Sequence, residues 1–426
     1  MRVREARLKP EYALSGIAFL LALTIALKPM PRDLQSLGAP GSDFALAVYY
    51  PVRAFLDGSN PYDQPPYLAS YPVPNAFAPY LPSTLVLHLP FAFVDPGLAR
   101  AWYLVIAICL TLVLAFLSLK LSGVKVSTAA VLLLGAAVVL SRPGRQNLLL
   151  GQVTLELVLA TYMTLYYAHS APRLSGLGLS LALTKLSYGG PLALLLLMRG
   201  HRRAVAYAGL CVLLLNVPVG AILAYRAGGV SPFTEQLSTT FGGFQAAGPA
   251  NNPVISPYRI DAVALLARFV GQPPDLAGQL LVTLAILGLA AVANRRLGEE
   301  PDSLGVSAGL NSTAVLLCVY HQNYDLLLLT MPFVWAASRG LHRLVDSRSV
   351  RITRVVLFTF LAVNYTASDS VLRRLGFLTG GEGLEALVSD PRARLLASLN
   401  GLALLSLFCA LVVTVLATPT RQTRQS

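Results

Sequence analysis

A single acidic residue stands at the start of an apolar helical pattern in the stretch 41-GSDFALAVYYPVRAFLDGSNPYDQ-64. Asp43 lies outside the apolar face that this pattern predicts. Four residues at helical spacing form that face: Phe44, Val48, Val52 and Phe55. A carboxylate held at a fixed position can act as a general base and take a proton from a hydroxyl group. The same residue type is also an ordinary helix cap, and the spacing leaves both interpretations open.

The limits of this helix are indicated by neighbouring residues. Ser42 or Asp43 can cap its start, and Gly58 can end it. Asn60 and the proline after it make the turn that follows. We therefore expect an amphipathic helix over 43–57 that lies on a membrane surface and holds the acid at a fixed depth.

Lys185 is a second candidate, because it is a cation inside the apolar run 174–198. If that run is one helix, Lys185 lies about 16 Å from its outer end. An unpaired cation at such depth costs at least ~2.5 kcal/mol. Glu156 on the preceding run lies at a different depth, beyond the reach of a lysine, and is expected to be structural. Lys185 then faces either a wet cavity, where it meets a phosphate group, or a structural partner elsewhere.

Two further side chains could meet an anion or a hydroxyl group. His321 follows the apolar run 304–320 and could bind a phosphate or orient a hydroxyl. Arg259 lies in the polar segment 226–275 and could assist phosphate binding. The alternatives are a hydrogen-bonded surface histidine and a solvated arginine.

The elements that must position these residues are membrane helices. The 426 residues are 55% hydrophobic and 12% charged, whereas soluble domains carry about 25% charge. Twelve apolar segments are long enough to span if tilt and broken helices are allowed, although 82–95 could be re-entrant. They lie near 12–28, 82–95, 100–119, 126–141, 152–168, 174–198, 204–225, 276–293, 304–320, 324–338, 352–368 and 393–417. The fold class is therefore an all-α polytopic membrane protein, with residues 1–426 as a single domain.

Charge predicts the orientation of this bundle. With twelve spans and the N-terminus inside, Lys and Arg predominate in the short inner loops, which is the bias expected of cytoplasmic loops. Both termini are then cytoplasmic, and the long loops 29–81 and 226–275 are extracytoplasmic, as is His321. This orientation explains the net charge of +13 without nucleic acid as a partner.

The remaining residue patterns exclude several kinds of site. All four cysteines lie in apolar runs without ligand spacing, so neither a zinc site nor a disulfide framework is predicted. The chain has no D-x-D, no P-loop and no G-x-G-x-x-G that opens a helix. We therefore expect no metal, no cofactor and no nucleotide-sugar donor.

Several motifs together resemble glycosyltransferase family 87. The pattern SDF…YYPVRAFLDGSNPY and the segment 71-YPVPNAFAPYLP-82 resemble its first outer loop. The segments 151-GQVTLELVLA-160, 176-GLGLSLALTKLSYGGPLALLLLMRG-200 and 320-YHQNYDLLLLTMP-332 resemble its GQ-led helix, lysine-bearing helix and late histidine segment. Thr154 stands where the family often has Asn, so no role is assigned to Gln152.

This resemblance implies a GT-C bundle in the plasma membrane that transfers a hexose, mannose being expected, from a polyprenyl-phosphate carrier. The acceptor would be a lipid or glycan at the extracytoplasmic face, and the anomeric centre would be inverted in one displacement. Asp43 would be the base, with Lys185 and His321 at the leaving phosphate. Tyr50, Asn60 and Tyr62 would line the acceptor side. Membrane lipids are the other expected partners, and the chain is expected to be monomeric.

A protein of another class could share much of this pattern. A transporter or flippase of lipid-linked saccharides, without chemistry of its own, would also need many helices and could use a buried lysine. It gives no reason for an acid-bearing surface helix in the first outer loop.

Overall fold

The computed structural model describes residues 10–31, 33, 41–77, 79–244, 250–297, 304–340, 348–365, 369–376 and 390–417. Every regular element in these ranges is a helix. The α-helices are α1 (Pro10–Leu27), α3 (Tyr50–Leu56), α4 (Gln64–Ser70), α5 (Ser83–Leu87), α6 (Pro96–Leu121), α7 (Thr128–Leu140), α8 (Arg142–Leu150), α9 (Thr154–Tyr167), α10 (Pro172–Ala182), α11 (Leu186–Met198), α12 (Arg202–Arg226), α13 (Val230–Gly243), α14 (Ala262–Val270), α15 (Leu276–Leu297), α16 (Leu304–Cys318), α17 (Thr330–Trp335), α19 (Arg348–Val363), α20 (Asp369–Arg374) and α22 (Pro391–Ala417). Short 3₁₀ or π segments are η1 (Ala45–Tyr49), η2 (Leu89–Phe93), η4 (Asn323–Leu329) and η5 (Ala336–Gly340).

Five of the described helices are long and apolar enough to cross a membrane, namely α1, α6, α12, α15 and α22. The bent pair α7 and α8, which meet at 77°, adds a sixth span if it is counted as one. The protein is thus an all-helical chain with several membrane-capable helices, and the count of twelve spans is not confirmed.

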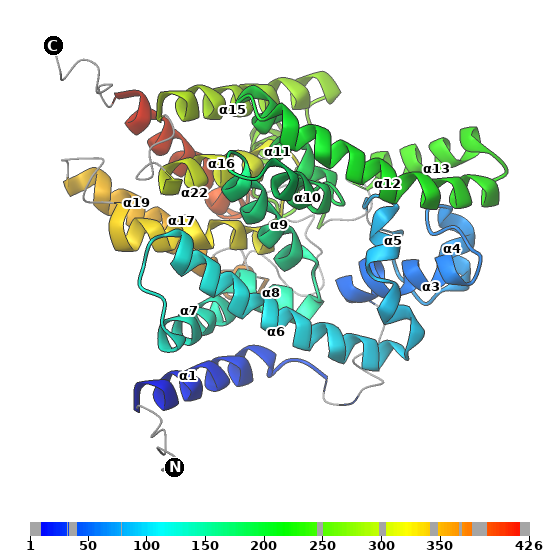
Figure 1. Cartoon of the computed structure of the whole chain (residues 1–426), viewed down its shortest axis with the longest axis horizontal. Coiled ribbons are helices and arrows are strands. Elements are labelled where there is room, and N and C mark those ends of the chain that lie inside the picture. Colours follow the sequence, from blue (N-terminus) through cyan, green and yellow to red (C-terminus); the bar gives the residue numbers. More distant parts are fainter. Residues whose placement is uncertain are drawn as a thin grey trace, which may run out of the picture.

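The bundle has two distinct ends (Figure 1). The start of α1 and the end of α22 lie at one end, whereas the short helices α3, α4 and α5 lie at the other with α13. Segments 1–9 and 418–426 are outside the described residues, so the predicted cytoplasmic location of the termini stays a prediction.

The segment 82–95 does not form one spanning helix. It consists of α5 and η2, which have five residues each, whereas a membrane span needs about 20. Next to it, Phe44 packs against Phe91 and Tyr103, with ring centroids 6.0 and 5.1 Å apart. Helix α6 therefore begins at the Asp43 end of the bundle. Lys120 lies at the opposite end of α6. The topology of twelve spans with the N-terminus inside predicts an outer loop after 100–119, on the same side as Asp43, so this part of the predicted topology is wrong.

The lysine-bearing segment 174–198 is also not one helix. Helix α10 ends at Ala182 and α11 begins at Leu186. The start of α10 and the end of α11 lie next to each other, as shown by the rings of His169 and His201, whose centroids are 4.3 Å apart. The segment therefore enters the bundle and returns, with Lys185 at its tip.

The predicted helix after Asp43 exists, but its apolar face packs inside the protein, so the predicted position on a membrane surface is not confirmed. Segments η1 and α3 run continuously over Ala45–Leu56. The side chains of Phe44, Val48 and Val52 are at most 1% exposed and belong to the protein core. Burial in a protein interior removes aromatic and aliphatic side chains from water just as burial in lipid does. The predicted apolar face is therefore present, but it packs against protein instead of lipid.

Candidate active site

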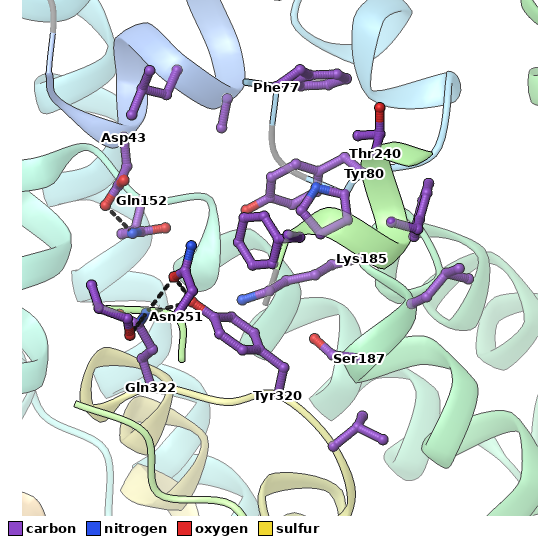
Figure 2. Close-up of a pocket in the computed structure, with 18 of the residues that line it drawn as sticks. Asp43, Phe77, Tyr80, Gln152, Lys185, Ser187, Thr240, Asn251, Tyr320 and Gln322 are labelled. Atoms are coloured by element: carbon purple, nitrogen blue, oxygen red, sulfur yellow. Dashed lines mark hydrogen bonds between the residues drawn. The ribbon is translucent and has the colours of Figure 1, made fainter. Parts of the chain in front are cut away.

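A cavity of about 1000 Å³ lies at the Asp43 end of the bundle. Its walls come from the first loop, α8, the break before α11, α13 and the segment after α16. Figure 2 shows Asp43 and Gln152 on one side and Lys185 and Tyr80 on the other, with Tyr320 below them. The fold thus brings a carboxylate and an ammonium group to one cavity from positions 142 residues apart in sequence.

Asp43 is not the cap of its helix. The hydroxyl of Ser42 accepts the hydrogen bond from the backbone N–H of Ala45 at 3.2 Å. The half-buried Asp43 carboxylate instead accepts a hydrogen bond from the side-chain amide of Gln152. Burial raises the pKa of the Asp43 carboxyl to about 6, against the opposing effects of the Lys185 charge and the Gln152 hydrogen bond. A carboxylate with this pKa is ionised at neutral pH and is a stronger base than an ordinary aspartate.

Gln152 is a site residue to which the sequence interpretation gave no role. It follows Gly151, whose left-handed backbone (φ +71°) ends α8 and directs the chain into α9. A side chain at position 151 would come within 2.6 Å of Phe44. The glycine is therefore needed for the close approach that brings Gln152 to Asp43.

Lys185 occupies the break between α10 and α11 and lines the cavity. Its backbone forms an isolated antiparallel bridge with Tyr80, and the neighbouring N–H of Leu81 donates to the carbonyl of Thr184 at 2.9 Å. Lys185 is buried, with 6% of its surface exposed. Its ammonium nitrogen lies 3.5 Å from an Asp325 carboxylate oxygen. It also lies 5.3 and 5.4 Å from the ring centres of Tyr188 and Tyr324.

Asp325 is the structural partner of Lys185 that the sequence interpretation missed. The carboxylate is fully buried, and donors other than Lys185 surround it. They are the hydroxyls of Tyr188 (2.9 Å) and Thr154 (3.1 Å) and the backbone N–H of Gln322 (2.9 Å). Such a set of hydrogen bonds stabilises a buried negative charge. Glu156 is indeed not the partner of Lys185, because its carboxylate contacts the Tyr103 hydroxyl at 3.0 Å and His88 Nε2 at 3.3 Å.

His321 supports Asp325 and does not reach the cavity wall. Its ring is fully buried, with Nδ1 3.1 Å from an Asp325 oxygen and Nε2 3.1 Å from the carbonyl of Ser187. Both ring nitrogens of His321 are thus within hydrogen-bonding distance of protein groups. In the structure His321 lies between η4 and α11 and does not line the cavity, so its predicted contact with a phosphate or hydroxyl group stays a prediction.

Arg259 is likewise occupied away from the cavity. Its guanidinium donates to both carboxylate oxygens of Asp261, at 2.8 and 2.9 Å, and both side chains are fully buried. A bidentate pair of this kind fixes geometry. Backbone bonds between Ile260 and His321 and between Asn323 and Tyr258 then tie this loop to the segment after α16.

The three residues predicted on the acceptor side hold the first loop instead of lining the cavity. Tyr50 packs edge-on against Tyr49. The amide of Asn60 donates to Gln236 of α13 at 2.7 Å, and the buried hydroxyl of Tyr62 donates to the carbonyl of Tyr80 at 2.6 Å. These contacts join the first loop to α13 and fix the backbone of Tyr80.

One wall of the cavity consists of amide and phenol groups to which the sequence interpretation gave no role. The Tyr320 hydroxyl donates to Asn251 Oδ1 at 2.7 Å, and the Gln322 amide lies 3.3 Å from the same oxygen. Gln64, Asn75 and Gln146 line other parts of the cavity. Neutral donors and acceptors of this kind suit sugar hydroxyls. Among the described residues, no group of three His, Cys, Asp or Glu side chains could hold a metal ion.

The amino-acid sequence that forms this site matches a known protein family. A family model described as glycosyltransferase family 87 matches residues 77–319, which is more than half of the chain. The match includes Gln152 and Lys185, whereas Asp43 and Asp325 lie outside it. No curated protein and no solved structure matches the chain. Because the match covers most of the chain, the protein belongs to glycosyltransferase family 87.

Proposed function

We propose that the protein transfers a hexose, with mannose as the expected sugar, from a polyprenyl-phosphate carrier to a lipid or glycan acceptor. Family membership supports a membrane glycosyltransferase that uses a sugar donor and an acceptor. The observation that carries the finer proposal is the presence of the Asp43 carboxylate and the Lys185 ammonium in one cavity. No observation favours a transporter or flippase.

In the proposed reaction, Asp43 accepts the proton of an acceptor hydroxyl. The oxygen of that hydroxyl forms a bond to the anomeric carbon as the bond from this carbon to the phosphate oxygen breaks. The bonding electrons leave with the phosphate, and Lys185 stabilises the charge that develops there. A single displacement of this kind inverts the anomeric centre. The leaving polyprenyl phosphate needs no proton from a second carboxylic acid.

The proposed location is the plasma membrane, with the cavity open to the extracytoplasmic face and the protein acting as a monomer. The support is the position of Lys120 and Lys125, which lie at the end of α6 opposite Asp43 and in the loop that follows it.

Product formation by the purified protein tests the function. The protein in detergent is mixed with polyprenyl-phosphate mannose and a membrane lipid extract, and glycolipid products are identified by mass spectrometry. A detergent solution has no membrane that separates two compartments, so transport cannot produce a new glycolipid and product formation requires sugar transfer. The absence of any product with mannose, glucose and galactose donors would refute the proposed donor class.

The raised pKa of Asp43 predicts a specific pH profile. Below pH 6 the carboxyl becomes protonated and can no longer accept a proton, so the rate at subsaturating substrates should fall. The decline should approach tenfold per pH unit, because one protonation removes the base. The donor is a phosphodiester and stays ionised over this range. Initial rates measured from about pH 4.5 to about pH 8 test this prediction. A rate that stays unchanged down to about pH 4.5 would contradict it.

Lys185→Met should weaken donor capture more than it harms the fold. Asp325 keeps the hydrogen bonds from Tyr188, Thr154 and Gln322 in this variant. The lost charge-assisted contact should lower the rate at subsaturating donor about 10- to 100-fold, with a smaller loss at saturation. The control is Lys125→Met, which removes an exposed lysine in the loop after α6. Equal donor dependence in the two variants would remove Lys185 from the site.

A further inference from the structure

Two buried side chains of α6 face the turn that carries Gln152. Arg100 and Tyr103 lie on one face of this helix, and they are 1% and 2% exposed. The Arg100 guanidinium donates to the carbonyls of Leu148 and Leu149, at 2.6 and 3.1 Å. These carbonyls belong to the last turn of α8, where a helix leaves its acceptors without partners and carries the negative end of its dipole. Arg100 therefore fixes the end of α8 directly before the turn.

The Tyr103 hydroxyl fixes the same turn on its other side. It lies 3.1 Å from the backbone carbonyl of Gln152 and 3.0 Å from a carboxylate oxygen of Glu156. The other oxygen of this carboxylate is 3.3 Å from His88 Nε2, so Glu156 is itself held in place. With Arg100 on one side of the turn and Tyr103 on the other, α6 binds three backbone carbonyls around Gln152.

The same two side chains hold the segment that carries Asp43. The centroid of the Phe44 ring lies 5.1 Å from that of Tyr103 and 5.6 Å from Cζ of Arg100. Asp43 directly precedes Phe44, and its carboxylate accepts the hydrogen bond from the Gln152 amide (Figure 2). Both members of this hydrogen bond are therefore attached to one surface of α6, although they are 109 residues apart in the sequence. The geometry of the bond depends on that surface.

We propose that Tyr103 is a positioning residue for sugar transfer: its hydroxyl holds Gln152 in the place from which the amide orients the Asp43 carboxylate. The inference rests on the proposed function, in which Asp43 is the base. Tyr103 does not line the active-site cavity, so it acts through Gln152 and not on a substrate. A carboxylate that accepts a well-aligned hydrogen bond ionises more readily, and its remaining lone pairs have a fixed direction. An acceptor hydroxyl then meets a base that is already oriented.

The ionisation of Asp43 should report on this support. Loss of the Tyr103 hydroxyl should weaken the hydrogen bond from Gln152 and so raise the pKa of the Asp43 carboxyl above its wild-type value. The fall in rate at low pH should therefore begin at a higher pH. A change at Tyr103 removes none of the other ionisable groups around this carboxyl. These groups are the Lys185 ammonium and the phenols of Tyr80, Tyr320 and Tyr324.

Tyr103→Phe tests this inference, with Tyr49→Phe as its matched control. The first variant keeps the packed aromatic ring and removes only the hydroxyl. Tyr49 is also buried, and its hydroxyl donates to the backbone carbonyl of Val94 at 2.9 Å, away from the turn at Gln152. We expect Tyr103→Phe to lower turnover at neutral pH about 3- to 10-fold and to move the fall in rate to higher pH. Tyr49→Phe should keep the wild-type pH profile, and equal profiles for the two variants would reject the inference.

A second substitution shows whether the effect passes through Gln152. Gln152→Met removes the side-chain amide, so the hydrogen bond to Asp43 is absent whichever residue occupies position 103. If Tyr103 acts through Gln152, Tyr103→Phe should change neither the turnover nor the pH profile any further in this background. An additive loss would mean that the hydroxyl acts by another route, for example through Glu156, and would overturn the inference.

Titration of Asp43 itself separates this inference from the proposed reaction. Infrared spectra of the protein in detergent follow the carboxyl band as the pH is changed, and the band that is missing in Asp43→Asn identifies this residue. A higher pKa of Asp43 in Tyr103→Phe than in Tyr49→Phe supports the positioning role even if no sugar transfer is found. The same pKa in both variants rejects it even if transfer is found.

Discussion

Asp43→Asn is expected to abolish sugar transfer, with a loss of about 10²- to 10⁴-fold in turnover at saturating donor. The asparagine oxygen can still accept the hydrogen bond that Gln152 donates to Asp43. The helix that follows is capped by Ser42, so the substitution leaves this cap in place. The amide cannot accept the proton of an acceptor hydroxyl, and this is the property that the variant removes.

A second acid in the same segment supplies the control for this variant. Asp57 is partly exposed and forms a surface ion pair with Arg53 at 3.1 Å, an interaction of small energetic weight. Asp57→Asn should therefore keep wild-type turnover. Initial rates and detergent melting curves of the two variants decide the case. An Asp43→Asn enzyme that is folded and turns over at the wild-type rate would show that another group is the base.

The local features of the first loop could be predicted because their signals are local. The helix after Asp43 was predicted over 43–57 and is found over Ala45–Leu56. Gly58 follows it with a φ of +87°, and the Asn60 side chain accepts from the N–H of Tyr62 at 3.1 Å to form the predicted turn. Caps, glycines and Asx turns act within a few residues, so the sequence around them is sufficient.

The path of the chain through the membrane could not be predicted in the same way. Apolar length identified α1, α6, α12, α15 and α22, but it does not distinguish one span from two short helices that return. The segment 174–198 is as apolar as a true span, and its break at Lys185 has no proline or paired glycines immediately beside it. The break is held instead by the bridge to Tyr80, a residue 105 positions earlier.

The partner of Lys185 was missed for a related reason. The depth argument for Lys185 assumed a straight helix, so it excluded Glu156 without indicating where the true partner lay. Asp325 is 140 residues away in sequence. A signal was nevertheless present in 320-YHQNYDLLLLTMP-332, because an acid that leads a run of four leucines must be paired or hydrogen-bonded if it is buried.

Asp325→Ala is expected to be the most destabilising substitution in the site, lowering the free energy of unfolding by about 3–5 kcal/mol. The carboxylate holds together η4, α9 and α11 through His321, Thr154 and Tyr188. Without it, the Lys185 ammonium is left in a buried site with no counter-charge among these contacts, and His321 Nδ1 loses its partner. Thermal unfolding of the purified variant in detergent should show a large drop in the melting temperature.

The double variant Lys185→Met with Asp325→Ala distinguishes loss of charge balance from loss of packing. Removing both members of a buried ion pair is less costly than removing one, because no unpaired charge remains from that pair. We therefore expect the double variant to melt above Asp325→Ala and below Lys185→Met, since His321, Thr154 and Tyr188 still lack their acceptor. A double variant no more stable than Asp325→Ala would mean that the carboxylate acts through hydrogen bonds alone. In that case Lys185 would be available to a donor phosphate at little cost to the fold. A double variant that recovers the melting temperature of Lys185→Met would instead show that the ion pair itself sets the position of Lys185 in the cavity.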